Sequence, residues 1–405
     1  MDAGGRDQGP NSRASLALRG FRPNAQEWRE ALISPTLDFD EACRRVREGH
    51  PDLFAQAAGL RDQAFGRTLT YSPKVFLPVT NLCRDRCSYC TFRKGPKDKG
   101  AHTMSLEEIS GVVERGDQAG CIEALLCLGD RPEAVFPSYR RLLGSMGYQT
   151  TTDYLVEVSK RCLELGMLPH TNAGILTSEE MARLRPYNVS MGLMLENISP
   201  RLCAVGGPHE SAPDKKPEVR LQMIEEAGRL KIPFTSGLLV GIGETIEERV
   251  ETLFALRDLQ HRYGHIQEVI VQIFRAKEET KMADFPEVSD EELFRTVAVA
   301  RLILGSEMNV QAPPNLTPEG HRGLIRAGIN DWGGISPLTK DFINPEAPWP
   351  HLDLLASLCR SEGYQLRPRL PVYPEYLVDD QWVDPGLRGH LEGQQKKLRQ
   401  TEHVA

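Results

Sequence analysis

The chain has 405 residues, a formal net charge of −7 and an isoelectric point near 5.9. It contains no dense run of Lys and Arg, the feature with which proteins bind nucleic acid or an anionic membrane. No segment has eighteen uninterrupted apolar residues, and the first twenty residues lack the apolar stretch and cleavage site of a secretory signal. These features favour a cytoplasmic protein that acts on a small molecule, with no nucleic-acid or membrane partner.

Short apolar segments alternate with amphipathic segments along most of the chain. We expect strands, each followed by a helix, at residues 74–80, 122–130, 167–174, 189–196, 233–243, 266–274, 308–314 and 329–334. Most of these strands are continuously apolar, which is typical of a parallel sheet buried on both faces. Seven or eight βα units in a row predict an α/β fold, a TIM-type (β/α)8 or partial barrel.

Helix-start signals support this segmentation. Ser105, Thr245 and Ser289 each precede a Glu by three residues, which is the pattern of a capping box. Thr317 followed by Pro318 predicts a further helix start, with the proline in the first helical position. The helices therefore begin where the apolar periodicity places them.

The barrel is expected to have extensions at both ends. We assign residues 1–70 to a polar N-terminus and a helical extension, residues 71–350 to the barrel, and residues 351–405 to a C-terminal helix and a polar tail. The stretches 1–24 and 385–405 are so polar that we expect them to fray.

Three of the nine cysteines, Cys83, Cys87 and Cys90, stand within the eight residues CRDRCSYC, directly after the first predicted strand. They therefore belong to the first βα loop, at the end of a barrel where such folds carry out chemistry. The spacing suits metal binding in a reducing compartment. Three thiolates can hold a [4Fe-4S] cluster and leave one iron free for an exogenous ligand. The alternative is a zinc-organised interaction module, with His102 as the fourth ligand.

The pattern C-x3-C-x-aromatic-C, with Tyr89 as the aromatic residue, resembles the signature of the radical S-adenosylmethionine (SAM) superfamily. The resemblance implies a [4Fe-4S] cluster whose open iron is chelated by the amino and carboxylate groups of SAM. Gly129 and Asp130 are similar to the family's Gly-Gly-Glu turn, which holds the SAM ammonium group. The chain departs from that turn at Leu128, in place of the first glycine, and at Asp130, in place of glutamate.

Two further motifs fit the same family. Glu196, at the end of the fourth predicted strand, matches the position from which the family reaches the ribose or the amino acid of SAM. Gly241 and Gly243 resemble the fifth-strand turn that lets the backbone approach the adenosine. Taken alone, Glu196 could be an ordinary strand-end carboxylate, and a G-x-G sequence is more often a tight turn.

A narrower resemblance rests on the segments YSPKVFLPVTNLCRDRCSYCTFRK, QAPPNLTPE and GINDWGGISPLTKDFINPEAPWP. They are similar to the family of 7,8-didemethyl-8-hydroxy-5-deazariboflavin (FO) synthase subunits, over about residues 70–365. The resemblance implies a radical SAM carbon–nitrogen lyase of coenzyme F420 biosynthesis. Such an enzyme forms FO from 5-amino-5-(4-hydroxybenzyl)-6-(D-ribitylimino)-5,6-dihydrouracil and releases ammonia, methionine and 5′-deoxyadenosine. The sister subunit that joins tyrosine to ribitylaminouracil, and a menaquinone-pathway cyclase, are the alternatives within the superfamily.

Such a substrate carries a phenol, a uracil and a polyol, so its pocket needs apolar surfaces and a few hydrogen-bonding groups. Polar and aromatic residues at the later strand ends are the candidates: His170, Asn172, Gln272, Arg275, Asn315, Asp331 and Trp332. A structural histidine and a hydrophobic plug are the alternative roles of His170 and Trp332. The family also implies an external one-electron donor and the tyrosine-joining subunit as a functional partner.

Overall fold

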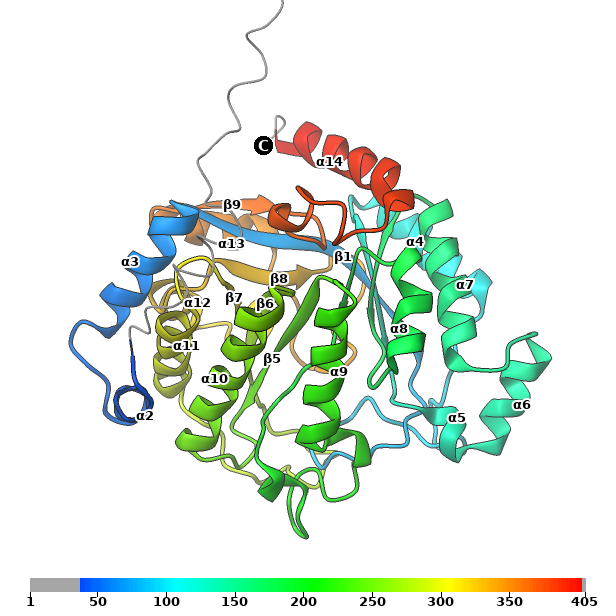
Figure 1. Cartoon of the computed structure of the whole chain (residues 1–405), viewed down its shortest axis with the longest axis horizontal. Coiled ribbons are helices and arrows are strands. Elements are labelled where there is room, and N and C mark those ends of the chain that lie inside the picture. Colours follow the sequence, from blue (N-terminus) through cyan, green and yellow to red (C-terminus); the bar gives the residue numbers. More distant parts are fainter. Residues whose placement is uncertain (1–36, 403–405) are drawn as a thin grey trace, which may run out of the picture.

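A computed structural model describes residues 37–402, which form a barrel of eight parallel strands surrounded by helices (Figure 1). The strands follow one another in chain order from β2 to β8, and β1 closes the barrel by pairing with both β8 and β2. The predicted (β/α)8 barrel is confirmed, and every strand expected from the apolar pattern is present.

The strands are β1 (Thr68–Thr80), β2 (Glu123–Leu128), β3 (Leu168–Asn172), β4 (Ser190–Gly192), β5 (Phe234–Val240), β6 (Ile266–Ile273), β7 (Asn309–Gln311), β8 (Asp331–Ile335) and β9 (Gln365–Pro368). The α-helices are α2 (Phe39–Glu48), α3 (Leu53–Phe65), α4 (Leu106–Gln118), α5 (Pro132–Val135), α6 (Pro137–Ser145), α7 (Thr151–Glu164), α8 (Ser178–Leu184), α9 (Pro217–Arg229), α10 (Ile246–Tyr263), α11 (Asp290–Leu304), α12 (His321–Arg326), α13 (Leu352–Ser361) and α14 (Arg388–Glu402). Short 3-10 helices occur at η1 (Arg185–Tyr187), η2 (Pro200–Cys203), η3 (Pro213–Lys215), η4 (Pro314–Leu316), η5 (Pro374–Tyr376) and η6 (Pro385–Leu387).

Three of the four predicted helix starts are confirmed. The hydroxyls of Ser105, Thr245 and Ser289 each accept a hydrogen bond from the backbone N–H three residues later, at the starts of α4, α10 and α11. The fourth prediction, a start at Thr317, is wrong. The Thr317 carbonyl closes a tight turn by accepting from the N–H of Gly320 at 3.0 Å, and α12 begins only after that turn.

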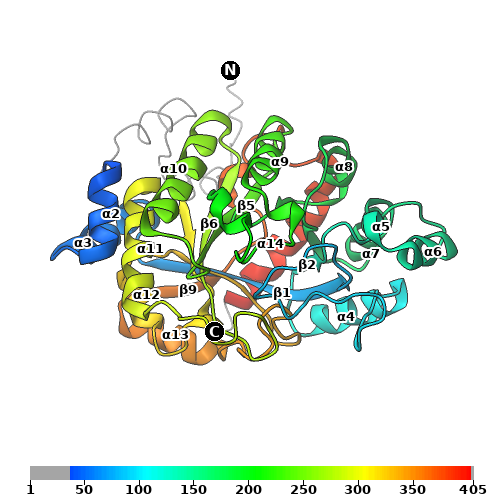
Figure 2. The same ribbon diagram turned by 90° about the horizontal axis from the view of Figure 1, so that it is seen from below.

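The N-terminal extension is helical in its described part, where α2 and α3 pack on α10 and α11. Residues 1–36, which include the whole predicted polar stretch 1–24 and the start of the predicted helical extension, lie outside the described residues. The helices α5 and α6, which the sequence did not predict, project from one side of the barrel (Figure 2). No helix within residues 37–402 is long and apolar enough to cross a membrane.

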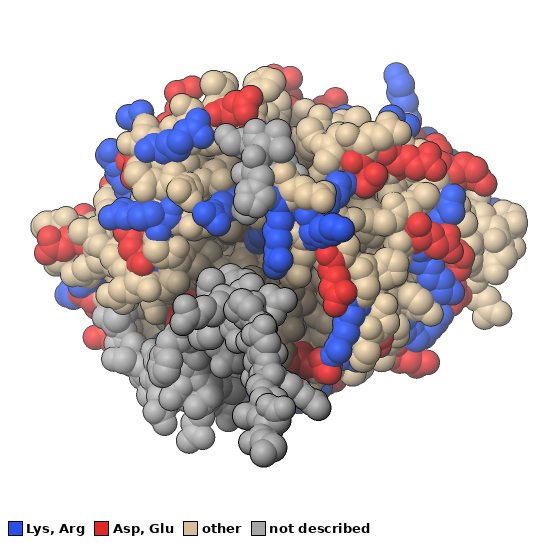
Figure 3. Space-filling view, turned by 90° about the horizontal axis from the view of Figure 1, so that it is seen from above, with Lys and Arg blue, Asp and Glu red and all other residues tan. Residues whose placement is uncertain are grey.

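The C-terminal part differs from the prediction. Strand β9 adds to β1 in parallel outside the barrel, with Gln365 opposite Thr68. The expected frayed tail is wrong for residues 388–402, which form α14 on the same end of the barrel (Figure 1). This helix is held by tertiary contacts, because Leu391 is buried and Lys397 lies 2.7 Å from Asp117. On the face seen in Figure 3, basic and acidic side chains are intermingled.

Candidate active site

The cysteine loop follows β1 at the C-terminal mouth of the barrel, as predicted. Cys83, Cys87 and Cys90 all line a cavity of about 330 Å³ that extends from the mouth into the barrel. The backbone N–H of Asp130, just after β2, donates to the Cys83 Sγ at 3.1 Å. The first two barrel strands therefore jointly set the position of the loop.

Backbone contacts hold this loop on both sides. A side chain on Gly129 would place its Cβ 2.1 Å from the carbonyl oxygen of Leu82, so only glycine lets β2 approach so closely. On the other side, carbonyls of the segment 208–214 accept the N–H groups of Arg86 at 2.9 Å and Ser88 at 2.8 Å. The three thiols therefore sit on a loop that the rest of the fold preorganises.

The donor set fits a cluster better than a single metal ion. The ligands of one zinc ion lie within about 4 Å of one another, because each is about 2.2 Å from the metal. Among the described residues, one group of His, Cys, Asp or Glu brings all its ligand atoms within 4.8 Å, namely Asp85, Asp130 and Asp214, and it contains no cysteine. His102 instead lies 3.1 Å from Glu108 and is half-exposed. The zinc interpretation is not supported, whereas a [4Fe-4S] cluster spaces its thiolates widely because each binds a different iron.

Glu196 forms a buried polar cluster at the same mouth. Its carboxylate accepts a hydrogen bond from the Tyr89 hydroxyl at 2.5 Å, lies 3.1 Å from the His209 Nε2 and pairs with the Lys215 Nζ. Burial alone would raise the pKa of this carboxyl, but the Lys215 ammonium and the His209 hydrogen bond hold the pKa well below its usual range. Glu196 is therefore a charged acceptor beside the cysteine loop.

The backbone of Glu196 is strained. Its φ of 64° lies in the left-handed region, which a residue with a side chain adopts rarely. Two hydrogen bonds to β5 impose this conformation: the Glu196 N–H donates to Gly237 at 2.8 Å, and its carbonyl accepts from Leu239 at 3.1 Å. Strain of this kind concentrates at functional sites, and here it turns the carboxylate toward the cavity, which Glu196 lines.

Three buried carboxylates, Asp85, Asp130 and Asp214, meet next to the cysteine loop. Burial, followed by repulsion from Asp214, raises the pKa of Asp130 to about 7 and that of Asp85 to about 6. Arg84 neutralises Asp214, since its Nε lies 2.5 Å from the carboxylate. Asp85 and Asp130 line the cavity, so a cationic group bound there would stabilise their ionised forms.

A roof formed by residues 336–349 covers part of the mouth, and it coincides with the segment that carried the narrower family resemblance. The Trp349 ring stacks on Phe76 at 5.2 Å, and the Thr339 hydroxyl accepts the Phe76 N–H at 2.9 Å. Lys277 donates to the carbonyl of Ile343 at 2.6 Å. The roof is thus attached to strand β1 and to the loop after β6.

Four of the predicted substrate residues line the cavity: His170, Asn172, Gln272 and Arg275. Arg275 already forms two ion pairs, with its guanidinium 3.0 Å from Glu287 and 2.9 Å from Asp290. The predicted SAM residues Tyr89, Gly129, Asp130 and Glu196 line the same cavity. The fold therefore brings together groups from five strand ends that are far apart in the sequence.

Three predicted substrate residues do not line the cavity, and these predictions are corrected. Asn315 is buried and donates to Asp341 at 3.0 Å, so it supports the roof. Asp331 lies at the start of β8, at the opposite end of that strand from the mouth. Trp332 is fully buried and packs edge-on against His321, because side chains alternate along a strand and this one faces the helices.

The turn after β5 is confirmed. Gly241 and Gly243 have φ values of 97° and 103°, which glycine adopts without strain. Neither glycine lines the cavity. A side chain would come within 3.3 Å of Val288 at position 241 and of Phe285 at position 243. Adenosine binding at this turn stays a prediction.

Several residues of the site were missed by sequence reasoning. His209, Asp214 and Lys215 come from the long connection after β4, which has no recognisable motif. Lys74 and Glu123, which form an ion pair of 2.8 Å inside the barrel, interrupt otherwise apolar strands. For Lys74 and Glu123, a single charged residue within an otherwise apolar strand was the one sequence signal that could have indicated a role in the site.

The comparisons with known proteins agree with this site. A family model described as the radical SAM superfamily matches residues 77–256, which contain the three cysteines and Glu196. The barrel and its three-cysteine loop therefore define a radical SAM protein, and its cofactors are a [4Fe-4S] cluster and SAM.

A "7,8-didemethyl-8-hydroxy-5-deazariboflavin synthase" of Methanopyrus kandleri is 51% identical over 310 residues, which cover 76% of this chain and 92% of that protein. The chain belongs to this family. An "FO synthase" of Mycobacterium tuberculosis is 49% identical over 384 residues, covering 90% of this chain and 45% of that protein. The chain thus spans about half the length of that relative.

The fold also resembles solved structures of low sequence identity. The hydrogenase maturase HydG from Carboxydothermus hydrogenoformans superposes with a TM-score of 0.70 at 17% identity, covering 94% of this chain and 90% of that chain. Methylornithine synthase superposes with a TM-score of 0.66 at 18% identity, covering 84% of this chain and 96% of that chain. These similarities show the barrel fold.

Proposed function

We propose that the chain forms FO from 5-amino-5-(4-hydroxybenzyl)-6-(D-ribitylimino)-5,6-dihydrouracil, with release of ammonia, methionine and 5′-deoxyadenosine. The observation that carries this proposal is the 51% identity to a deazariboflavin synthase over 92% of its length. The cavity supports it, because it joins the cysteine loop to a polar barrel interior that a large, hydroxylated substrate can enter.

In this proposal Cys83, Cys87 and Cys90 hold the cluster, and Tyr89, Gly129, Asp130, Glu196, Gly241 and Gly243 bind SAM. When bound, the cluster and SAM supply a 5′-deoxyadenosyl radical after one electron enters. Conversion of the adduct to FO removes ammonia and two hydrogens: the bound SAM would take one as a hydrogen atom, and the other would leave as a proton while its electron would return to the cluster. The protein positions the reacting carbon and excludes water.

The residues of the mouth fit these tasks. Glu196 is held charged by Lys215, so it can accept hydrogen bonds from the hydroxyls or ammonium group of SAM. Asp130 lies between the cysteine loop and β3, where its carboxylate accepts from the N–H of Ile175 at 3.1 Å. The roof, anchored on Phe76, shields the cavity from solvent.

We also propose two partners. A one-electron donor must reduce the cluster, since the chain holds no second redox group among its described cysteines. The substrate requires a radical SAM unit that joins tyrosine to ribitylaminouracil, and we propose this subunit as the functional partner. This is supported by the FO synthase of M. tuberculosis, more than half of whose length has no counterpart in this chain. The cytoplasmic location stays a prediction.

The test is an anaerobic assay of the reconstituted protein with the purified adduct, SAM and a reductant. We expect a brown protein with about four irons, whose electron paramagnetic resonance spectrum changes when SAM binds. We further expect fluorescent FO and 5′-deoxyadenosine to accumulate together. A protein that cleaves SAM to 5′-deoxyadenosine but forms no FO from the adduct would contradict the proposal.

The same assay separates the sister functions. Turnover of tyrosine and ribitylaminouracil, with no reaction of the adduct, would assign the chain to the tyrosine-joining subunits instead. Turnover of a menaquinone precursor alone would assign it to the cyclases. The products of these two sister reactions can be distinguished from FO, because only FO carries the deazaflavin fluorescence.

A further inference from the structure

The half of the barrel that lies farther from the cysteine loop is unusually polar. The interior of a (β/α)8 barrel is normally filled by branched aliphatic side chains. Here the inward positions at the base of the cavity carry Glu123 on β2, Thr235 on β5, Glu268 on β6 and Gln311 on β7. All four are buried. This part of the cavity, which we call the polar floor, lies away from the cysteine loop along the strands.

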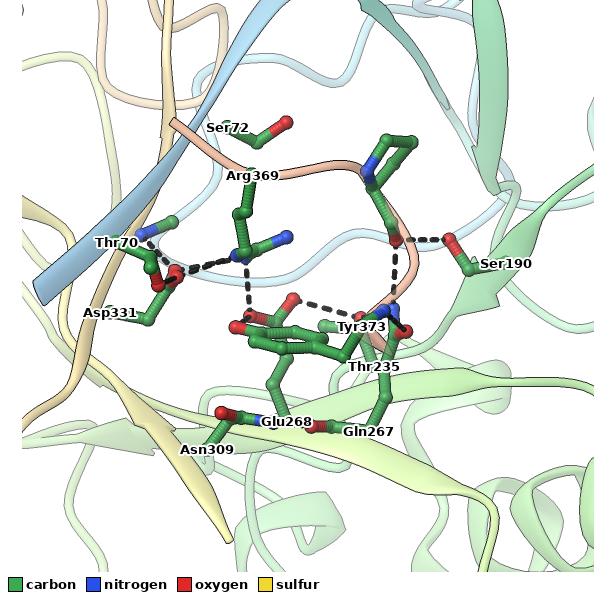
Figure 4. Close-up of polar contacts among 12 residues, drawn as sticks. Thr70, Ser72, Ser190, Thr235, Gln267, Glu268, Asn309, Asp331, Arg369 and Tyr373 are labelled. Atoms are coloured by element: carbon green, nitrogen blue, oxygen red, sulfur yellow. Dashed lines mark hydrogen bonds and ion pairs between the residues drawn. The ribbon is translucent and has the colours of Figure 1, made fainter. Parts of the chain in front are cut away.

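The charges of the polar floor are already paired. Figure 4 shows the segment after β9 crossing the barrel, with Arg369 between Asp331 and Glu268. Higher up, Lys74 lies 2.8 Å from Glu123. Because both cations are engaged by carboxylates, the polar floor suits a neutral, hydrogen-bonding ligand and disfavours a phosphate.

Two hydrogen-bonding groups of the floor, the Gln311 amide and the His170 Nε2, have no hydrogen-bond partner among the described residues. Gln311 is 6% exposed and lines the cavity, and its side-chain amide has no hydrogen bond to any residue of the described range 37–402. His170 is equally buried, and only its Nδ1 is engaged, 2.7 Å from the Ser190 hydroxyl. Buried amide and imidazole groups are rarely left unpaired in a folded protein, so these two indicate a ligand.

The hydrogen-bond chain defines the tautomer of His170. The Ser190 hydroxyl donates its single hydrogen to the carbonyl of Pro371 at 2.7 Å, so it must accept from the Nδ1–H of His170. Burial also lowers the pKa of His170 to about 4, so the ring is neutral. The Nε2 is therefore a bare acceptor, which suits a hydroxyl donor.

The glycines of β8 make room for two side chains of the cavity, Gln311 and Lys74. A side chain on Gly333 would place its Cβ 1.9 Å from the Gln311 amide, and one on Gly334 would overlap Lys74. Above the polar floor, the half-buried Phe76 and Ile270 line an apolar belt. The cavity thus has an apolar middle and a neutral polar end.

We propose that the polar floor is a polyol subsite that binds the ribityl arm of the substrate, with Gln311 and the His170 Nε2 contacting its hydroxyls. The inference rests on the proposed function, which supplies the ribityl group. The planar rings then lie in the apolar belt, and the benzylic carbon points toward the cysteine loop. The subsite selects for a neutral, hydroxylated arm.

The test compares two substrates on two variants. Gln311→Met removes the amide at similar volume, and His170→Asn keeps a donor toward Ser190 but removes the Nε2 acceptor. With the ribityl adduct we expect each variant to lose about tenfold in kcat/KM, through a raised KM, because one neutral hydrogen bond is lost. With an adduct that carries a methyl group in place of the ribityl arm, we expect each variant to match the unaltered enzyme within about twofold. Gln118→Met, the same change at an exposed position at the end of α4, is the matched control.

Equal losses on both substrates would overturn the subsite, since the arm would then not be the group that Gln311 and His170 bind. Failure of the unaltered protein to convert either substrate would instead overturn the proposed function. Titration calorimetry with FO and its N-methyl analogue gives a reading that does not depend on turnover. Tenfold weaker binding of FO alone supports the subsite, and equal binding of FO to variant and unaltered protein contradicts it.

Discussion

Replacing Arg369 with methionine should strongly destabilise the fold. Arg369 follows β9 and is nearly buried inside the barrel. Its guanidinium donates to Asp331 at 2.6 and 2.9 Å and to Glu268 at 2.9 Å. Methionine fills a similar volume but leaves both buried carboxylates without their cation.

The magnitude follows from the burial of the partners. Asp331 is fully buried and Glu268 is 6% exposed, so water compensates only weakly for the lost partner. Truncating one member of a buried ion pair costs about 3–5 kcal/mol. We expect the free energy of unfolding of Arg369→Met to fall by this amount. That of Arg369→Lys should lie between the values of the unaltered protein and Arg369→Met, since lysine keeps the charge but cannot bind two carboxylates as a planar fork.

The assay is urea denaturation of the cluster-loaded protein under anaerobic conditions, followed by circular dichroism. The matched control is Arg388→Met, because Arg388 pairs with Asp380 at the surface, where both side chains are more than half exposed. Exposed pairs contribute about 0–1 kcal/mol. If Arg369→Met and Arg388→Met lower the free energy of unfolding equally, the reasoning about the buried network is wrong.

Three further predictions follow from the site and from one buried histidine. Cys87→Ala should abolish cluster iron and 5′-deoxyadenosine formation but leave the circular dichroism spectrum unchanged, because the barrel core does not depend on the metal. Glu196→Gln should weaken SAM binding at least tenfold in calorimetry, because it removes the charge that Lys215 stabilises. Burial lowers the pKa of His265 to about 3, so between pH 6.5 and 3 the unfolded chain binds more protons at this site than the folded one. Stability should therefore fall as the pH drops through this window, by up to about 1.4 kcal/mol per pH unit, and His265→Gln should flatten that dependence in urea denaturation.

Each of these has an outcome that contradicts it. Loss of the fold in Cys87→Ala would point to a structural metal site, and Cys203→Ala, the control, should retain iron and activity. An unchanged dissociation constant for SAM in Glu196→Gln would remove Glu196 from the SAM site. The same slope of stability against pH in His265→Gln and in the unaltered protein would show that other groups dominate the titration.

Local patterns in the sequence predicted much of the fold. The apolar runs identified all eight barrel strands, because a strand covered on both faces is mostly apolar along its length. Capping residues located α4, α10 and α11, since a cap acts within one turn of its own helix. Thr317 failed as a cap because its carbonyl is used in a turn, which no local pattern reveals.

The site was predicted as far as its motifs are continuous. The three cysteines lie in one short loop and were indicated by their spacing, and the resemblance to the family signature added Tyr89 from the same loop. Trp332 was misplaced because the side of a strand that faces the cavity depends on register, and a slip of one residue exchanges the two sides. His209 and Lys215 were missed because they reach Glu196 from a connection without any regular pattern.

The sequence by itself determined the barrel class and the three-thiol loop, because both depend on periodicity and on spacing over a few residues. Only the tertiary structure decided which charges meet inside the barrel. Arg369 reaches Glu268 across 101 positions of the chain, and α14, expected as a frayed tail, packs against the barrel through the buried Leu391. Contacts of this range depend on how the strands close around one another, which the physics of short segments does not determine.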